Sequence, residues 1–340
     1  MNCFDEDMMK IAINLAKEAE GKTSPNPLVG AVVVKDKLVI GQGYHHKAGS
    51  PHAEVNAIND VAGSTDGATI YVTLEPCSTV GRTPACTDLI IKSRIKKVVI
   101  GSLDPNPAHA GNGVKILEKH GIEVITGILE DECEKLNEAF FKWIVTKKPF
   151  VILKMAMTLD GKIATKEGQS KWITGAEARA RVQRLRNWAD AILVGGETIR
   201  QDDPSLTVRE FEVDNQPKVA ILSSKIKREE TKYFKDGRDV FVYKLDNDFT
   251  WQDLLLDLGK NEVTALLIEG GGEVAASALF ANAVDKVEFH IAPKILGGAD
   301  SRSVVGGENP NSLVDALNLI EVNVESCGSD IIVTGYVGDK

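Results

Sequence analysis

The sequence predicts an α/β protein built from two domains. Its 340 residues exceed the length of one typical domain, and its hydrophobic (43%) and charged (26%) fractions are ordinary for a globular protein. Strand-like and helix-like segments alternate along both halves, which implies sheets covered by helices on both faces. A helical segment that ends at Pro149 separates the halves, so we place the domains at 1–146 and 147–340.

The first half begins with a helix and a β-hairpin. Residues 5–20 carry apolar side chains at helical spacing, with acidic residues in the first turn. The runs AVVVK and LVIGQGY flank the tight turn Asp36-Lys37, a pattern typical of a hairpin. Periodicity then predicts an alternating series, with helices at 53–63, 87–92 and 111–121, strands at 68–75, 96–104 and 122–128, and one last helix at 128–148.

A metal-ligand pattern lies between residues 51 and 86. His52 and Glu54 stand at the start of one predicted helix, and Cys77 and Cys86 follow the next predicted strand. One imidazole and two thiolates form a three-ligand zinc set whose fourth position is open to water. His-x-Glu followed by Pro-Cys and a second Cys is also the signature of zinc-dependent base deaminases. We therefore predict one Zn²⁺ bound by the His and both Cys, with Glu54 moving protons.

The spacing of the two cysteines departs from that signature. The general pattern is Cys-x-x-Cys, whereas Cys77 and Cys86 are separated by the run STVGRTPA. This run must loop out for both thiolates to reach one metal.

The second half begins with a buried strand. The stretch after Pro149, FVILKMAMTLDGKIAT, begins as a continuous apolar run, as in a central strand of a parallel sheet. Further segments continue the α/β pattern, with helices at 176–189, near 251–258 and after Gly272, and strands at 191–204, 218–224, 239–244, 264–272 and 286–296.

One strand of this half runs straight into three glycines and a helix, LLIEGGGEVAASAL. Glycines let a ligand approach the backbone, and the amides and dipole at a helix start favour an anion. The segment from Gly270 to Ala275 fits G-x-G-x-x-A. It lies late in the domain, whereas a Rossmann fold would place it at the first βα turn, so we do not predict a Rossmann fold.

The runs SPNPLVG, GYHHKAGSPHAEV, YVTLEPCSTVGRTPAC and DPNP resemble the bifunctional riboflavin-biosynthesis deaminase/reductase family, and the second half matches it too. The resemblance implies a cytidine-deaminase-like three-layer domain followed by a dihydrofolate-reductase-like domain. It also implies zinc-dependent deamination of 2,5-diamino-6-(5-phosphoribosylamino)pyrimidin-4-one and then NADPH-dependent reduction of the ribosyl chain to ribityl.

The same resemblance implies roles for individual residues. The deaminase substrate contacts it implies are Asn26, His45, Arg82, Asp104 and Asn106, while Thr79 stands where the family commonly has His. The NADPH contacts are Ala156, Trp172, Thr198, Asp202, Ser223, Gly271, Gly272, Glu273, Val274, Ala275, Ala276 and Ser277. The reductase substrate contacts are Lys154, Ser170, Arg186, Leu206, Arg209 and Glu269, of which the two arginines suit a phosphate.

Composition bears on the competing functions. A net charge of −9 argues against a nucleic-acid base editor, which would need a basic, aromatic-bearing groove. A deaminase with a non-catalytic, ligand-sensing second half is the other alternative.

No apolar run approaches about 18 residues, and no signal peptide is evident. We expect a cytoplasmic protein that contacts no membrane, acts on small molecules and forms a homo-oligomer.

Overall fold

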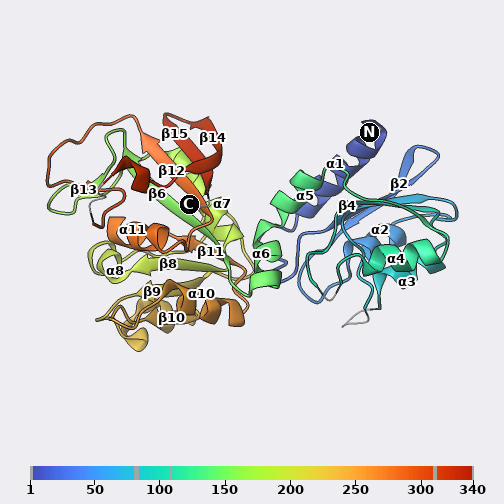
Figure 1. Cartoon of the computed structure of the whole chain (residues 1–340), viewed down its shortest axis with the longest axis horizontal. Helices are drawn as coiled ribbons and strands as arrows, with labels where there is room; N and C mark the ends of the chain where they lie inside the picture. The colour runs from blue at the N-terminus through green and yellow to red at the C-terminus, as the bar shows by residue number, and fades with distance from the viewer. Residues whose placement is uncertain (1–2, 80–83, 108, 309–311, 339–340) are drawn as a thin grey trace. The chain divides into compact units, whose positions relative to one another are not determined.

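The computed structural model describes residues 3–79, 84–107, 109–308 and 312–338. Arg82, a predicted substrate contact, lies outside these ranges. The chain divides into two compact units, Met1–Lys147 and Lys148–Lys340 (Figure 1). Among the helices of the described residues, none is both long and apolar enough to cross a membrane.

The first unit contains a five-stranded sheet in the order β2-β1-β3-β4-β5. The antiparallel hairpin joins β1 and β2, and both residues of its turn, Asp36 and Lys37, have positive φ. The hairpin is therefore confirmed, with the φ values of a type I′ turn. β1 is also antiparallel to β3, whereas β3, β4 and β5 are parallel. The strands span Gly30–Lys35 (β1), Leu38–Tyr44 (β2), Thr69–Leu74 (β3), Lys97–Ser102 (β4) and Glu123–Ile125 (β5).

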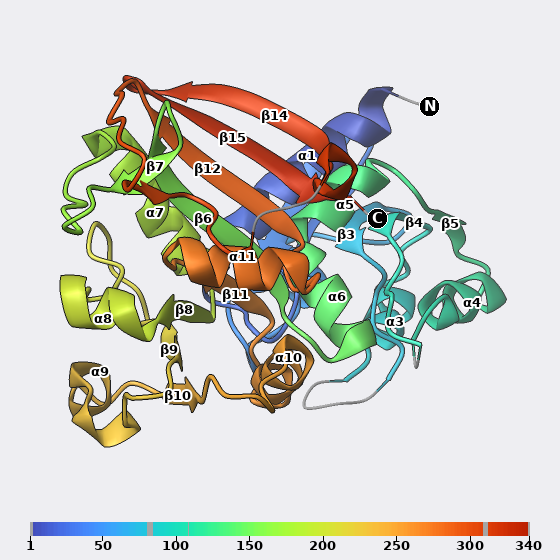
Figure 2. The same ribbon diagram turned by 60° about the vertical axis from the view of Figure 1, so that its left-hand side comes forward.

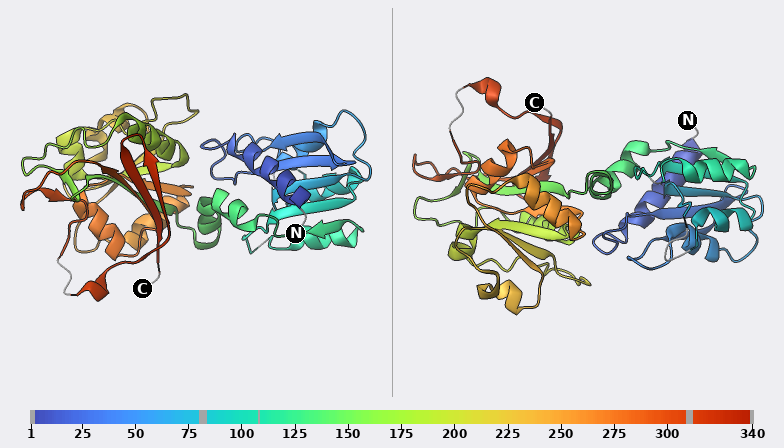
Figure 3. Two further views of the ribbon diagram at one scale, coloured as in Figure 1. Left: turned by 90° about the horizontal axis from the view of Figure 1, so that it is seen from above. Right: turned by 60° about the horizontal axis from the view of Figure 1, so that its bottom comes forward.

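Helices cover both faces of this sheet (Figure 3). One core packs α1 (Cys3–Lys17) and α5 (Glu130–Leu136) against residues such as Val32 and Val99. The other core packs α2 (Ala53–Asn59), α3 (Cys86–Lys92) and α4 (Asn112–Lys119) against the alternate residues of the same strands. This division follows from the period of two in a strand, and it confirms the three-layer prediction.

The predicted single helix over 128–148 is wrong, because the segment forms two helices, α5 and α6 (Glu138–Thr146). They meet at Asn137, whose φ of −119° is not helical. The Asn137 side chain accepts a hydrogen bond from the Leu28 amide (2.8 Å) and donates one to the Leu28 carbonyl (2.9 Å). A long-range contact therefore overrides the local helical periodicity.

The second unit contains an eight-stranded sheet in the order β10-β9-β8-β11-β6-β12-β15-β14. The first six strands of this order are parallel, and β15 and β14 are added antiparallel as a hairpin. Figure 2 shows β12, β15 and β14 as long neighbouring strands. The strands span Phe150–Thr158 (β6), Ala191–Gly195 (β8), Lys218–Leu222 (β9), Val240–Tyr243 (β10), Ala265–Ile268 (β11), Lys286–Ala292 (β12), Leu319–Cys327 (β14) and Asp330–Val337 (β15).

The helices and short elements of this unit are α7 (Ala176–Trp188), α8 (Gly196–Asp202), α9 (Lys232–Lys235), α10 (Trp251–Lys260), α11 (Gly272–Phe280), and the two-stranded pair of β7 (Lys162–Ala164) and β13 (Arg302–Ser303). The predicted strand over 191–204 is wrong beyond Gly195, because residues 196–202 form α8. The carboxyl ends of β8, β11 and β6 lie next to each other, where open α/β sheets bind ligands.

Candidate active sites

The predicted zinc ligands meet at one end of the first sheet. His52 is the N-cap residue of α2, Cys77 follows β3, and Cys86 is the first residue of α3. His52 Nδ1 lies 3.3 Å from Cys86 Sγ and 3.6 Å from Cys77 Sγ. All three ligand atoms lie within 4.8 Å of one another, and no other such group of His, Cys, Asp and Glu occurs in the described part of the chain.

This geometry fits a tetrahedral zinc ion. Zn–S bonds of about 2.3 Å and Zn–N bonds of about 2.05 Å place sulfur and nitrogen roughly 3.6 Å apart at a tetrahedral angle. The two N···S distances agree with that separation. The residues present therefore match zinc in donor chemistry as well as in spacing.

Glu54 lies beside these ligands in the first turn of α2. Its side chain is buried, with 3% exposure. Burial, and after it the charge of Cys77, raises the pKa of the Glu54 carboxyl to about 7. A carboxyl with a pKa near neutrality can both accept and donate a proton, as general acid–base catalysis requires.

Half-buried Asn26 and buried His45 form a pair next to His52. His45 Nδ1 lies 3.1 Å from the Pro51 carbonyl, which can only accept, so we assign the proton to Nδ1. His45 Nε2 then accepts from Asn26 Nδ2 at 3.1 Å. Burial lowers the pKa of His45, which favours this neutral form. The pair leaves Asn26 Oδ1 as an acceptor for another group.

A buried carboxylate, Glu75, joins the cysteine loop to the segment that holds Asp104 and Asn106. Its oxygens accept hydrogen bonds from four backbone amides, those of Asp104 (3.2 Å), Gly111 (3.0 Å), Gly113 (2.8 Å) and Val114 (3.4 Å). Asp104 in turn accepts from the Asn106 amide at 2.8 Å. Glu75 therefore fixes these four residues relative to Cys77, which follows it by two positions.

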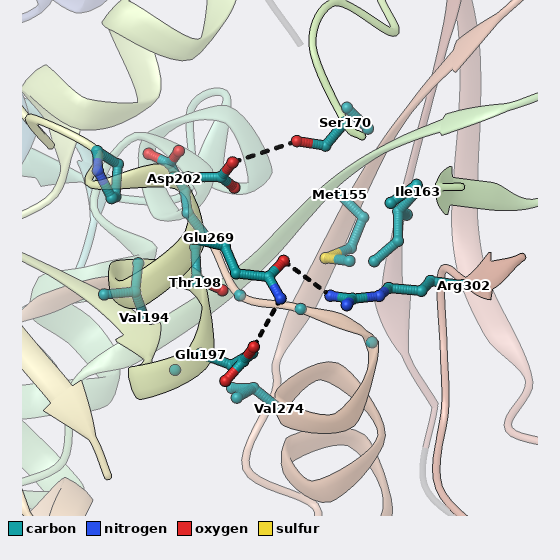
Figure 4. Close-up of a pocket in the computed structure, with 18 of the residues that line it drawn as sticks. Met155, Ile163, Ser170, Val194, Glu197, Thr198, Asp202, Glu269, Val274 and Arg302 are labelled. Carbon is teal, nitrogen blue, oxygen red and sulfur yellow. Dashed lines mark hydrogen bonds between the residues drawn. The ribbon is translucent and has the colours of Figure 1, made fainter. Parts of the chain in front are cut away.

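The second unit has a cavity of about 700 Å³ at the carboxyl ends of β6, β8 and β11. Figure 4 shows Ser170 beside Asp202, joined to it by a dashed line, and Arg302 directed inward. Ser170 Oγ donates to Asp202 Oδ1 at 3.3 Å. A Cβ on Gly272 would lie 2.4 Å from the Ser303 carbonyl, so only glycine fits this edge of the cavity.

A buried ion pair lies at the base of the cavity. The Arg186 guanidinium donates to both oxygens of Glu269 (2.7 and 2.9 Å) and to the Thr207 carbonyl (3.0 Å). Burial would raise the pKa of Glu269, but Arg186 outweighs it and lowers that pKa below its ordinary value. Burial lowers the pKa of Lys154, against the opposing charge of Glu269. The Arg186 charge is thus largely neutralised.

Most predicted residues of the second unit converge on this cavity. The lining includes Lys154, Ala156, Ser170, Arg186, Thr198, Asp202, Leu206, Glu269, Gly271, Gly272, Glu273 and Val274. Trp172 instead lines an adjoining cavity of about 320 Å³ and stacks against Arg179, with 4.8 Å between the guanidinium and the ring.

Within the described ranges, five further predicted residues besides Trp172 are not among those that line the larger cavity. Ala275 and Ala276 are in the core, and Ser277 Oγ accepts from Trp251 at 2.9 Å. Ser223 Oγ accepts from the amides of Lys225 and Ile226. Arg209 is exposed and donates to Ser205 Oγ at 3.1 Å.

Sequence reasoning missed Glu75 and Arg302. Glu75 stands directly before Pro76-Cys77, and this position could have drawn attention to it. A carboxylate beside a metal-ligand loop needs hydrogen-bond donors from the surrounding chain. Arg302 lies in a short strand with no local motif, and only its pairing with β7 brings it to the cavity.

Comparisons with known proteins agree with this geometry in both units. Residues 3–102 match the cytidine and deoxycytidylate deaminase zinc-binding region, and residues 149–333 match the RibD C-terminal domain. The riboflavin biosynthesis protein RibD of Actinobacillus pleuropneumoniae is 43% identical, over 97% of this chain and 94% of its own. The chain belongs to the RibD family. It is therefore a bifunctional deaminase and reductase of riboflavin biosynthesis.

Other RibD proteins show the same likeness. RibD of Aquifex aeolicus is 43% identical over 97% of this chain and 98% of its own. A solved diaminohydroxyphosphoribosylaminopyrimidine deaminase/5-amino-6-(5-phosphoribosylamino)uracil reductase from Thermotoga maritima superposes with a TM-score of 0.91, at 39% identity, over 98% of this chain and 99% of its own. Acinetobacter baumannii RibD gives a TM-score of 0.90 at 36% identity, over 99% of each chain. The expected family and both activities are thereby confirmed.

Proposed function

We propose that the first unit deaminates 2,5-diamino-6-(5-phosphoribosylamino)pyrimidin-4-one at a site that holds one Zn²⁺. The observation that supports this most is the convergence of His52, Cys77 and Cys86 beside buried Glu54. Zn²⁺ held by these residues supplies Lewis acidity that lowers the pKa of a water. Incubation of the purified protein with this pyrimidine, followed by mass analysis and ammonia measurement, tests the proposal directly.

The residues of the chain then carry out the proton transfers. Glu54 takes a proton from the attacking water and delivers it toward the ring and the leaving amine, so that water and the amine become a carbonyl and ammonia. Asn26 presents Oδ1 to a donor group on the pyrimidine, and His45 fixes that orientation. Asp104 and Asn106, with Arg82, complete the proposed substrate contacts.

Loss of the metal should abolish only the deamination carried out by the first unit. Cys77→Ala removes one of the two thiolates, so we expect bound zinc to fall below about a tenth of one equivalent and ammonia release to become undetectable. Reduction of the deaminated uracil should continue at the wild-type rate. The measurements are elemental analysis, ammonia release and NADPH oxidation.

The matched control is Cys133→Ala, because Cys133 is buried against α1 and β4, away from the ligand group. It should keep full zinc and deamination. A Cys77→Ala protein that retained stoichiometric zinc would contradict the assignment of this ligand.

Glu75→Gln should weaken substrate binding without loss of metal. The amide keeps the shape of the carboxylate but places an NH₂ group against amides that donate, so Asp104 and residues 111–114 lose part of their anchor. We expect the KM for the pyrimidine to rise about tenfold, which corresponds to roughly 1.4 kcal/mol. Elemental analysis should show unchanged zinc. Exposed Glu118→Gln on α4 is the control, and an unchanged KM for Glu75→Gln would contradict the role.

We further propose that the cavity of the second unit binds NADPH and the deaminated 5-amino-6-(5-phosphoribosylamino)uracil. NADPH supplies the hydride that reduces C1′ of the sugar. The amides and helix dipole at Gly271–Val274 suit the cofactor phosphates, and Ala156, Thr198 and Asp202 line the same cavity. Trp172, Ser223, Ala275, Ala276 and Ser277 remain proposed contacts outside that lining. NADPH oxidation that depends on the uracil is the test.

The substrate side of this cavity carries the polar groups that the reduction needs. Lys154 and Asp202 are the candidates to protonate the sugar oxygen, and Ser170 and Leu206 line the same cavity. Glu269, the third predicted candidate, is ionised near neutral pH because Arg186 lowers its pKa, so it has no proton to donate. Arg209 provides an exposed cation for the substrate phosphate, while Arg186 orients Glu269. We also propose that the protein is cytoplasmic and forms a homo-oligomer. Light scattering of the purified protein would test the homo-oligomer.

A further inference from the structure

Four consecutive carbonyls of the loop after α8 are held by three side chains from one segment. Lys232 Nζ donates to the Asp203 carbonyl (2.6 Å), and the Tyr233 hydroxyl donates to the Pro204 carbonyl (2.6 Å). Arg238 donates to the carbonyls of Ser205 (2.7 Å) and Leu206 (2.8 Å). The orientation of every peptide plane in this loop is therefore fixed from residues 232–238.

This orientation determines where the amides point. In a trans peptide the N–H points opposite to the preceding C=O, and the cis peptides of the described chain lie elsewhere. The amides of Ser205, Leu206 and Thr207 are thus directed away from the Tyr233 and Arg238 side chains. Pro204 and Leu206 line the 700 Å³ cavity, whereas Tyr233 and Arg238 do not.

The backbone that carries these three amides is curved at Leu206. Leu206 has a φ of +50°, and a left-handed residue of this kind turns successive amides toward one point, which suits an anion. Within the described residues, no hydrogen-bond partner is present for the amides of Ser205, Leu206 and Thr207. The Arg209 guanidinium lies at the same loop, on Ser205 Oγ.

The supporting segment is itself rigid. Tyr233 is completely buried, and the Arg238 guanidinium stacks 4.8 Å from its ring centre. Lys232 also pairs with the Asp203 carboxylate at 2.8 Å. A carbonyl anchored by a buried or charged donor cannot turn without loss of that hydrogen bond.

We propose that Arg238, with Tyr233 and Lys232, positions the amides of residues 205–207 to bind the phosphate of the reductase substrate. The inference rests on the proposed function, in which Leu206 and Arg209 contact that substrate. None of the three touches the substrate. They are positioning residues that act through the loop carbonyls.

The test compares two substrates in each variant. Reductase kinetics are measured at saturating NADPH with 5-amino-6-(5-phosphoribosylamino)uracil and with the same compound after phosphatase treatment. Tyr233→Phe removes one hydroxyl and keeps the ring, and we expect the KM for the phosphorylated substrate to rise about threefold. Arg238→Met frees two carbonyls and should raise it about thirtyfold, with partial recovery in Arg238→Lys.

Only the KM for the phosphorylated substrate should change. In both variants we expect kcat, the NADPH dissociation constant and the KM for the dephosphorylated substrate to stay within about twofold of wild type. Tyr243→Phe is the matched control for the hydroxyl, because Tyr243 donates to Asp257 (2.7 Å) on α10. Arg228→Met is the matched control for the arginine, because Arg228 only stacks on Phe234.

The possible outcomes distinguish failure of the positioning role from failure of the proposed function. If wild type prefers the phosphorylated substrate and both variants keep the full preference, the positioning role is wrong while the proposed function stands. Equal losses on both substrates would also overturn the positioning role. If wild type shows no preference or no turnover, phosphate recognition fails and this inference fails with it. Should Arg238→Met not fold, Tyr233→Phe decides.

Discussion

Glu54→Gln is expected to reduce ammonia release by at least about a thousandfold while zinc stays bound. The substitution keeps the size and burial of the side chain but removes the group that accepts and returns protons, a contribution that is typically about 10²–10⁴-fold. The three ligand atoms are untouched, since Glu54 is not one of them. Ammonia release and elemental analysis of the same preparation are the measurements.

Two comparisons make the Glu54 result specific. Asp60→Asn removes a carboxylate from the exposed end of the same helix and should leave deamination unchanged. Reduction of the deaminated uracil should also be unaffected in Glu54→Gln, because Glu54 belongs to the first unit and the residues of the proposed reductase site belong to the second. A Glu54→Gln protein that released ammonia within tenfold of wild type would rule out the proton-transfer role.

The zinc ligands could be predicted from sequence because each stands directly beside an element that local pattern reveals. His52 begins a helix, and the predicted strand 68–75 leads straight to Cys77, so an α/β sheet must bring them to one end. The hairpin was predictable for the same reason, from two alternating runs around one turn. These features depend on short stretches of chain.

The features that sequence missed depend on contacts between distant residues. Asn137 interrupts a segment with helical periodicity because its side-chain amide hydrogen-bonds to the backbone of Leu28, 109 positions earlier. Arg238 holds carbonyls more than 30 positions away, and nothing in its own surroundings marks it. The predicted strand over 191–204 ended early because α8 begins at Gly196, directly after the apolar run ends at Val194.

Arg186→Met is expected to have the largest effect on stability, since it leaves the largely buried Glu269 carboxylate without its partner. The two side chains have exposures of 10% and 14%, and loss of one member of such a pair typically costs about 3–5 kcal/mol. The free energy of unfolding of the second unit should fall by that amount at pH 7. Tryptophan fluorescence in urea is a suitable measurement, because Trp172, Trp188 and Trp251 all lie in this unit.

The double variant and the pH dependence identify the cause. Arg186→Met with Glu269→Gln should recover most of the lost stability, whereas exposed Arg200→Met should change little. Because Arg186 lowers the pKa of Glu269 below its ordinary 4.5, the pair stabilises the folded protein above that pH. Its contribution disappears as the pH falls through the lowered pKa, so the wild-type advantage over Arg186→Met should shrink in acid. An advantage that stayed constant down to about pH 2 would show that Arg186 stabilises the unit by packing rather than by charge.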